Sequence, residues 1–156
     1  MMKKVFFAAL AVALTISCAN ASNKTTSAAD TKKSDKNSKV TVLTGAEYKS
    51  KVEDYSTKEW KFEGKRPAVV DFYADWCPPC KKLAPVMEEV AAEFDGKVDF
   101  YKVNVDNAQE VARAYGISSI PTVLFIPVDG EPVRNLGFMI KEDFVSKVNA
   151  NCLKKK

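Results

Sequence analysis

The segment "DFYADWCPPCKK", residues 71–82, carries two cysteines three positions apart. Such a pair can supply half of a zinc site, form a structural disulfide, or act as a reactive pair of thiols. Zinc needs four ligands, but the chain has no histidine, and its other cysteines, Cys18 and Cys152, are isolated. We therefore expect no metal site. A disulfide across so short a loop restricts the unfolded chain very little, so the reactive pair is favoured over a structural disulfide.

The reactive interpretation depends on where the two cysteines fall in the fold. The apolar stretch "AVVDFYA", residues 68–74, predicts a buried strand, and apolar residues recur at helical spacing after the cysteines. Cys77 is then at a helix start, where the helix dipole and free N–H groups favour thiolate over thiol. Pro78 and Pro79 suit the first turn, whose N–H groups have no helical partner. Cys80, one turn later, is placed to attack a mixed disulfide at Cys77, so Cys77 is the candidate nucleophile and Cys80 the resolving thiol.

Strands and helices alternate around this site. The alternation ends with a hairpin and a final helix, which predicts an α/β domain with a mixed sheet and helices on both faces. The expected strands cover residues 40–43, 68–74, 98–105, 122–126 and 132–137, and the last two flank the turn signal Asp129-Gly130. The expected helices are one over 46–53 opened by a capping box of Thr44 and Glu47, the helix after the cysteines, a short helix ended by Gly116, and a last helix from about Lys141.

The first residues are typical of an export signal rather than of a folded domain. Residues 1–21 contain a basic start, the apolar run Val5–Ile16, and small residues, Ala19 and Ala21, around a cleavage point. A buried N-terminal helix is the alternative, although the run has no amphipathic face. Cys18 stands where a bacterial lipoprotein signal carries its lipidated cysteine, so cleavage after Ala21 and a lipid anchor at Cys18 both stay open. Either outcome predicts a location in the periplasm or cell envelope.

The remaining chain divides into a tether and a domain, which differ in composition and in net charge. Residues 22–39 contain no large apolar side chain and are predicted to be a flexible tether, which leaves 40–156 as the domain. The formal charge of +4 includes Lys3 and Lys4 of the signal and five lysines and two aspartates of the tether, so residues 40–156 carry a net charge of −1. A domain without a basic excess does not attract phosphates, and nucleic-acid binding is not expected.

Four motifs carry a family resemblance. In sequence order they are "VVDFYADWCPPCKKLAP", "VNVD", "YGISSIPTVLFI" and "LGFMIKEDF". In order and spacing they resemble the thioredoxin family over residues 40–152. The resemblance implies the thioredoxin fold, and thiol–disulfide exchange by a redox-active disulfide of Cys77 and Cys80 with no other cofactor. The chain departs from most cytoplasmic thioredoxins at Pro78, where they have glycine, and at Tyr73, where they often have tryptophan. These departures leave the redox potential open.

The resemblance also gives Asp71 the role of a buried carboxylate that exchanges a proton with Cys80. The sequence supports this independently, because Asp71 is one charge inside an otherwise apolar strand and burial raises the pKa of a carboxyl group. A carboxylate that is paired only for structural reasons is the alternative. Lys102 matches a family lysine on the adjacent strand, and is either the partner of Asp71 or a solvated lysine.

Four further residues are implied to contact substrate. The Ile120-Pro121 peptide matches the family's cis proline beside the disulfide, where the backbone of Ile120 can pair with an extended substrate; a plain strand start is the alternative. Trp76 resembles the family tryptophan next to the nucleophile, and either covers apolar substrate or packs over the helix start. Gly137 matches a glycine near the site, although a turn alone would also require it.

Cys152 falls at helical spacing after Phe144 and Val148. This spacing favours a buried, inert thiol, and an exposed thiol or an intermolecular bridge is the alternative. We assign Cys152 no catalytic role.

The function expected from these features is that of an envelope thioredoxin that reduces or reshuffles disulfides in exported proteins, with a membrane electron donor as a further partner. One alternative is an oxidase that donates its disulfide, which the same two cysteines can support. Another is a thiol reductase of cytochrome maturation, although those relatives typically carry an inserted element and the connections 94–98 and 105–109 are short. A non-catalytic module that holds unfolded chains beside Pro121 would not need either thiol. The sequence gives no strong indication of an oligomer.

Overall fold

The structure is a computed structural model that describes residues 38–153. The predicted signal over 1–21, with Cys18, lies outside the described residues, as does most of the predicted tether. The last two tether residues, Ser38 and Lys39, are described, and both make hydrogen bonds to side chains of the domain. Within the described range, no helix has the length and apolar character needed to cross a membrane.

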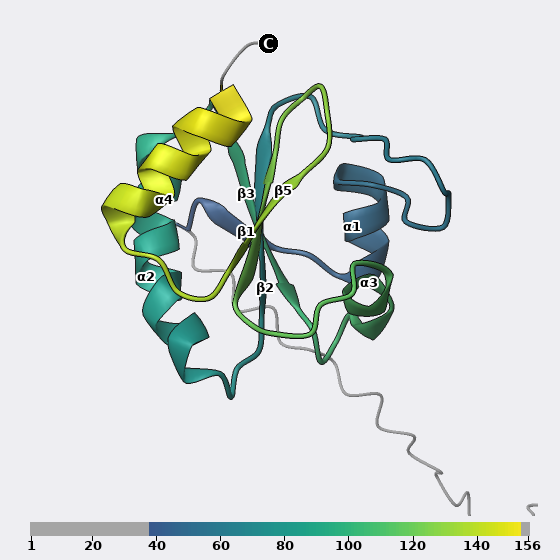
Figure 1. The fold of residues 1–156 in the computed structure, drawn as a ribbon, viewed down its shortest axis with the longest axis horizontal. Helices are drawn as coiled ribbons and strands as arrows, with labels where there is room; N and C mark the ends of the chain where they lie inside the picture. Colours follow the sequence, from purple (N-terminus) through teal and green to yellow (C-terminus); the bar gives the residue numbers. More distant parts are fainter. Residues whose placement is uncertain (1–37, 154–156) are drawn as a thin grey trace, which may run out of the picture. The chain divides into compact units, whose positions relative to one another are not determined.

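Five strands form one mixed sheet in the order β1-β3-β2-β4-β5 (Figure 1). Strands β1, β3 and β2 are parallel, β4 is antiparallel to β2, and β5 is antiparallel to β4. The central strand β2 is buried over nearly its whole length, as its continuous apolar run predicts. The strands are β1 (Val40–Val42), β2 (Ala68–Tyr73), β3 (Asp99–Asn104), β4 (Thr122–Ile126) and β5 (Val133–Leu136).

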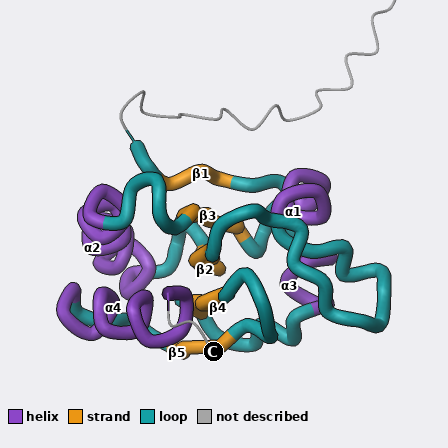
Figure 2. The backbone as a smooth tube through the Cα atoms, turned by 90° about the horizontal axis from the view of Figure 1, so that it is seen from above, coloured by secondary structure: helices purple, strands orange, loops and turns teal. Residues whose placement is uncertain are grey.

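Helices cover both faces of this sheet, which confirms the predicted architecture. Figure 2 shows α2 and α4 on one face and α1 and α3 on the other. The alternation of side chains along β2 divides the core accordingly, because Val69 packs on the α2 and α4 side and Val70 on the α1 and α3 side. The helices are α1 (Gly45–Lys51), α2 (Pro78–Glu93), α3 (Gln109–Ala114) and α4 (Lys141–Val148), which continues into a π-helical turn (Asn149–Leu153).

The local signals in the sequence have the expected structural effects, and the observed ends of the elements differ from the predicted ends by at most two residues. The capping box at α1 is present, since Thr44 Oγ1 accepts from the N–H of Glu47 and Glu47 Oε2 accepts from the N–H of Thr44. Strands β4 and β5 form the predicted hairpin. Its connection spans residues 127–132, one residue more than the predicted strands leave, and Pro127 and Pro132 lack the N–H that would extend the ladder.

Candidate active site

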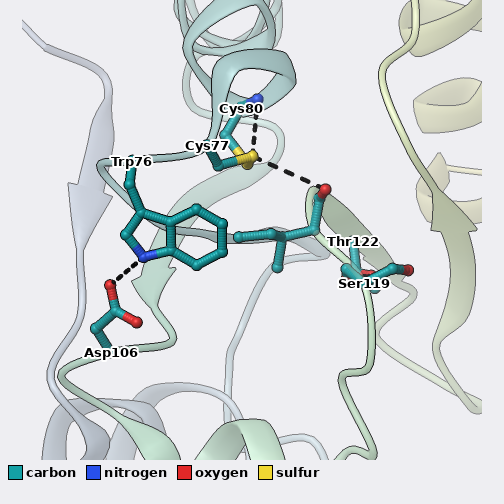
Figure 3. The surroundings of a disulfide bond; sticks show 7 residues. Trp76, Cys77, Cys80, Asp106, Ser119 and Thr122 are labelled. Atoms are coloured by element: carbon teal, nitrogen blue, oxygen red, sulfur yellow. Dashed lines mark hydrogen bonds between the residues drawn. A yellow bond between two sulfur atoms is a disulfide. The ribbon is translucent and has the colours of Figure 1, made fainter.

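Cys77 and Cys80 form a disulfide at the start of α2, with their Cα atoms 5.3 Å apart. Cys77 is the N-cap residue of the helix, and Pro78 and Pro79 fill its first two positions. The N–H of Cys80 donates to Sγ of Cys77 at 3.2 Å (Figure 3). Both prolines lack an N–H, so Cys80 is the first residue of the helix that can donate. One hydrogen bond and the positive end of the helix dipole therefore stabilise a thiolate at Cys77.

The disulfide lies below the surface of the domain. Cys77 and Cys80 are each only 2% exposed, and they pack together with Ala74. The residues next to them in the chain are exposed: both prolines lie at the surface, and Trp76 is 67% exposed. A substrate disulfide therefore reaches Cys77 by passing the side chains that surround it.

A loop from the other half of the chain lies against the disulfide. The Ile120-Pro121 peptide bond is cis, as the family resemblance implies. The carbonyl oxygen of Ile120 is 3.8 Å from Sγ of Cys77, and Thr122 Oγ1 donates to the carbonyl oxygen of Ser119 within the same loop (Figure 3). The structure thus places Ile120 and Pro121 at the candidate site.

Gly137 joins this loop from the end of β5. Its N–H donates to the carbonyl oxygen of Pro121 at 2.8 Å. Its φ of +83° is in the region that favours glycine, and no atom lies within 4 Å of where a Cβ would stand. The backbone conformation by itself accounts for a glycine here, in agreement with the turn interpretation, while the predicted contact of Gly137 with substrate stays a prediction.

Asp71 is completely buried on β2. Neither of its carboxylate oxygens has a hydrogen-bond partner among the described residues. Burial raises the pKa of Asp71 from 3.8 to about 7, and the positive charge of Lys102 opposes this rise. A carboxyl group with this pKa can both accept and return a proton near neutral pH. The predicted chemical property of Asp71 is present in the structure, while its proton exchange with Cys80 stays a prediction.

Lys102 lies opposite Asp71 in the parallel pairing of β2 with β3, but the described residues contain no ion pair between them. Its Nζ lies instead 4.1 Å from the centre of the Tyr73 ring. Lys102 therefore lowers the pKa of Asp71 through its positive charge without forming an ion pair with it. This arrangement lies between the two predictions, which were an ion-pair partner of Asp71 and a solvated lysine. Nothing in the sequence patterns had indicated the contact with Tyr73.

Two residues near Trp76 had been given no role from the sequence. The indole Nε1 of Trp76 donates to Oδ2 of Asp106 at 2.9 Å (Figure 3), and the N–H of Asp106 donates to Oδ1 of Asn104 at 2.9 Å. Both residues belong to the motif "VNVD". The available signal was their position at the end of β3, since the ends of adjacent parallel strands meet at one edge of the sheet.

Cys152 lies away from this site, in the core between the sheet and α4. It is free, 4% exposed, and its Sγ donates to the carbonyl oxygen of Ala68 at 3.7 Å. Burial raises the pKa of its thiol to about 12. This environment agrees with the interpretation of an inert thiol. In the part of the chain that the structure describes, no group of three or more His, Cys, Asp or Glu side chains is placed to hold a metal ion.

The assembled site has the parts that thiol–disulfide exchange requires. It holds a sulfur stabilised at a helix start and a second sulfur bonded to it, and β2, the strand that leads to this helix start, carries a buried carboxyl group with a raised pKa. The cis-proline loop contributes a wall beside the first sulfur.

Comparison with known proteins gives a family match over most of the chain. The thioredoxin family model matches residues 39–150. The chain is 48% identical over 103 residues to a thioredoxin of Borreliella burgdorferi, an alignment that covers 65% of this chain and 88% of that protein. It is 53% identical over 74 residues to a chloroplastic M-type thioredoxin of Spinacia oleracea, which covers 47% of this chain and 41% of the spinach protein.

A solved structure shows a similar fold. The crystal structure of chloroplastic thioredoxin z superimposes with a TM-score of 0.61 and 28% sequence identity, covering 71% of this chain and 92% of that one.

Proposed function

This chain belongs to the thioredoxin family, and on that premise we propose that it works in the cell envelope, where it reduces or reshuffles disulfides in exported proteins. It is a thiol–disulfide oxidoreductase, and, as in other thioredoxins, the Cys77–Cys80 disulfide is the redox centre without a further cofactor. The envelope location is supported by the signal pattern of residues 1–21.

The first half of the reaction uses the helix start. In the reduced protein, the thiolate of Cys77 attacks one sulfur of a substrate disulfide, and the other substrate sulfur leaves as a thiolate that takes a proton. A mixed disulfide between Cys77 and the substrate results. The N–H of Cys80 and the helix dipole make Cys77 the sulfur that is favoured as a thiolate, and this placement carries the assignment of roles.

The second half releases the reduced substrate. The thiol of Cys80 loses its proton to the carboxylate of Asp71 and attacks Sγ of Cys77. The Cys77–Cys80 bond forms, the mixed disulfide breaks, and the second substrate sulfur leaves as a thiolate. Two electrons have then passed from the protein to the substrate, and a membrane electron donor is the proposed source that reduces the protein again.

The observation that best supports a catalytic function is the location of the disulfide between the helix start and the carbonyl group of Ile120. A module that only holds unfolded chains has no need of this placement. The connections from Glu93 to Asp99 and from Asn104 to Gln109 are short, which argues against the cytochrome-maturation alternative. The same geometry suits an oxidase and a reductase, and the redox potential of the disulfide decides which of the two directions is favoured.

Reduction of insulin in the presence of dithiothreitol tests the proposed activity. The wild-type chain should accelerate precipitation of the insulin B chain, and Cys77→Ser should show only the rate of dithiothreitol alone. Cys152→Ala is the matched control, because it removes the buried thiol that lies outside the site. Loss of acceleration in the Cys152→Ala variant as well, with the fold intact, would contradict the assignment to Cys77.

Two measurements test the direction of electron flow and the location. Equilibration with glutathione buffers gives the redox potential, and a value near that of the strongest known oxidases would reverse the proposed direction. Fractionation of cells that express the full chain should place it in the envelope. With Cys18→Ala, a lipid-anchored protein moves to the soluble periplasmic fraction, whereas a protein cleaved after Ala21 does not move. Retention in the cytoplasm would contradict the proposed location.

A further inference from the structure

A short chain of polar contacts connects the two residues before Cys77 to the end of β3. Asn104 is only 7% exposed, and its side-chain amide uses both ends. Its Nδ2 donates to Oδ2 of Asp75 at 3.2 Å, and its Oδ1 accepts from the N–H of Asp106 at 2.9 Å. Oδ2 of Asp106 then accepts from the indole Nε1 of Trp76 at 2.9 Å (Figure 3). Asp75 and Trp76 are therefore both fixed to the same neighbouring segment.

The segment that makes these contacts is itself well supported. The N–H of Val105 donates to the carbonyl oxygen of Tyr73, which joins the ends of β3 and β2. The N–H groups of Asn107 and Ala108 donate to the carbonyl oxygen of Asn104, which closes the turn before α3. Asp106 thus presents its carboxylate from a turn whose backbone is held on both sides.

Trp76 needs such an external support because it has little packing of its own. Its side chain is 67% exposed, so burial does not fix its rotamer. A hydrogen bond from an indole to a carboxylate is directional and stronger than one to a neutral acceptor. Cys77, the next residue, is only 2% exposed, and the indole of Trp76 is the large exposed apolar side chain adjacent to it in the chain.

We propose that Asn104 and Asp106 are positioning residues that hold the indole of Trp76 beside the disulfide, and through it set the rate at which protein disulfides react with Cys77. This inference rests on the proposed function, because it needs a protein substrate that contacts Trp76. Asp106 acts through Trp76 and not on the reacting sulfurs. Asn104 acts through Asp106 and Asp75.

The test is a double-mutant cycle with two substrates, insulin and the small disulfide 5,5′-dithiobis(2-nitrobenzoic acid). Asp106→Ala should lower kcat/KM for insulin about fivefold to tenfold, since it frees the ring. With the small disulfide, which does not span the ring, the loss should stay below about twofold. Asp106→Asn keeps an oxygen that can accept from the indole, so it should restore most of the insulin rate although it removes the same charge.

The second arm of the cycle uses Trp76→Phe, which has no N–H to donate. In that background Asp106→Ala should cause no further loss with insulin. Asp129→Ala is the control for removal of an aspartate. Asp129 is exposed in the hairpin connection after β4, and this end of β4 pairs with the start of β2, whereas the disulfide follows the end of β2. Asn104→Ala should reproduce the loss seen with Asp106→Ala if its thermal unfolding shows a folded domain.

Several outcomes would overturn the proposal. Equal slowing of both substrates by Asp106→Ala would show a general effect on the site, as would a full additional loss in the Trp76→Phe background. An Asp106→Asn variant as slow as Asp106→Ala would show an effect of charge and not of position. If the wild-type chain reduces neither substrate, the proposed function fails first, and this inference fails with it.

Discussion

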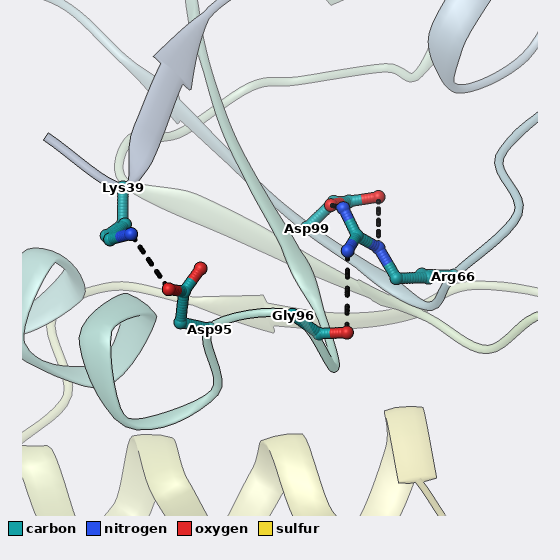
Figure 4. A network of polar contacts seen from close by, with 5 residues as sticks. All are labelled: Lys39, Arg66, Asp95, Gly96 and Asp99. Carbon is teal, nitrogen blue, oxygen red and sulfur yellow. Dashed lines mark hydrogen bonds and ion pairs between the residues drawn. The ribbon is translucent and has the colours of Figure 1, made fainter.

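Two aspartates on neighbouring strands, Asp71 on β2 and Asp99 on β3, lie in opposite surroundings. Asp71 is fully buried, and neither oxygen has a hydrogen-bond partner among the described residues. Asp99, at the start of its strand, accepts hydrogen bonds at both oxygens from the guanidinium group of Arg66, which also donates to the carbonyl oxygen of Gly96 (Figure 4). One carboxylate has no hydrogen-bond partner among the described residues, and the other has a hydrogen-bond partner at each oxygen.

The contrast extends to the direction of the pKa. Beside Arg66, the ammonium group of Lys39 is 2.8 Å from Oδ2 of Asp95 and lowers the pKa of that carboxyl group (Figure 4). Burial raises the pKa of Asp71 to about 7. Exposed ion pairs contribute little to stability and little to chemistry. A buried carboxylate without a partner lowers stability at neutral pH, and the proposed proton exchange with Cys80 would give this carboxylate a function.

The largest effect is expected from a variant that removes one of the two active-site cysteines. Cys80→Ser should leave Cys77 able to attack and unable to be released, so a mixed disulfide with the substrate accumulates and turnover falls by more than about 10³-fold. Mass spectrometry of the trapped species measures this. Alkylation of the reduced wild-type chain with limiting reagent at low pH should label Cys77 first. Labelling of Cys80 first would show that Cys80, and not Cys77, is the nucleophile, and would contradict the assigned roles.

The variant Asp71→Asn tests the contrast between the two aspartates most directly. The unfolded chain loses the Asp71 proton near pH 3.8 and the folded chain near pH 7, so between these values only the folded protein keeps it. The unfolding free energy of wild type therefore falls relative to that of the variant as the pH rises from about 4 to 7, and stays lower above pH 7. At pH 8 the variant should be more stable by about 2 kcal/mol and at most about 4 kcal/mol, while resolution by Cys80 slows.

Denaturant unfolding at pH 4 and pH 8, with the reduced proteins, measures this difference. Asp99→Asn is the matched control, because it makes the same chemical change in a carboxylate that has partners. An Asp71→Asn variant that is less stable than wild type at pH 8 would show that the buried carboxylate is paired for structural reasons. Equal slowing of attack and resolution would deny Asp71 its role as proton acceptor.

A smaller effect is expected at the helix start from Pro78→Gly. Proline offers no N–H, and Cys80 is the one donor observed for Sγ of Cys77 among the described residues. Glycine adds a possible donor, which should stabilise the thiolate and move the reduction potential by about 20 mV to a less negative value. Equilibration of wild type and variant in the same glutathione buffer measures the shift. A potential that becomes more negative would contradict the argument from the missing donor.

The smallest effect is expected from Asp99→Asn itself. Loss of an exposed ion pair should lower Tm by no more than about 4 °C and leave insulin reduction unchanged. The difference from wild type should shrink in 1 M salt, because salt screens exposed charges. Arg66→Gln should behave in the same way, since it removes the other partner of the pair. A fall in activity in either variant would end the distinction between the two regions.

Most of the fold was predictable because its signals are local. The capping box of Thr44 and Glu47, the alternation of strands and helices, and the closing hairpin depend on residues close together in the chain. The hairpin connection was predicted to within one residue, because the turn signal Asp129-Gly130 and the flanking Pro127 and Pro132 lie close together in the chain. The family motifs supplied the cis peptide at Pro121, which residue patterns alone do not specify.

The sequence by itself determined the reactive pair. Cys77 and Cys80 are three residues apart, and a strand followed by a helix places the first of them at the helix start whatever the rest of the chain does. The tertiary structure alone decided what surrounds this pair. It brought the carbonyl group of Ile120 to Cys77 across 43 residues of sequence, and the carboxylate of Asp106 to Trp76 across 30.

It also decided that Asp71 is left without a partner and that Lys102 lies over Tyr73. The physical reason is that capping and helix dipoles act over a few residues of chain, whereas desolvation and directional hydrogen bonds depend on every element packed around a group.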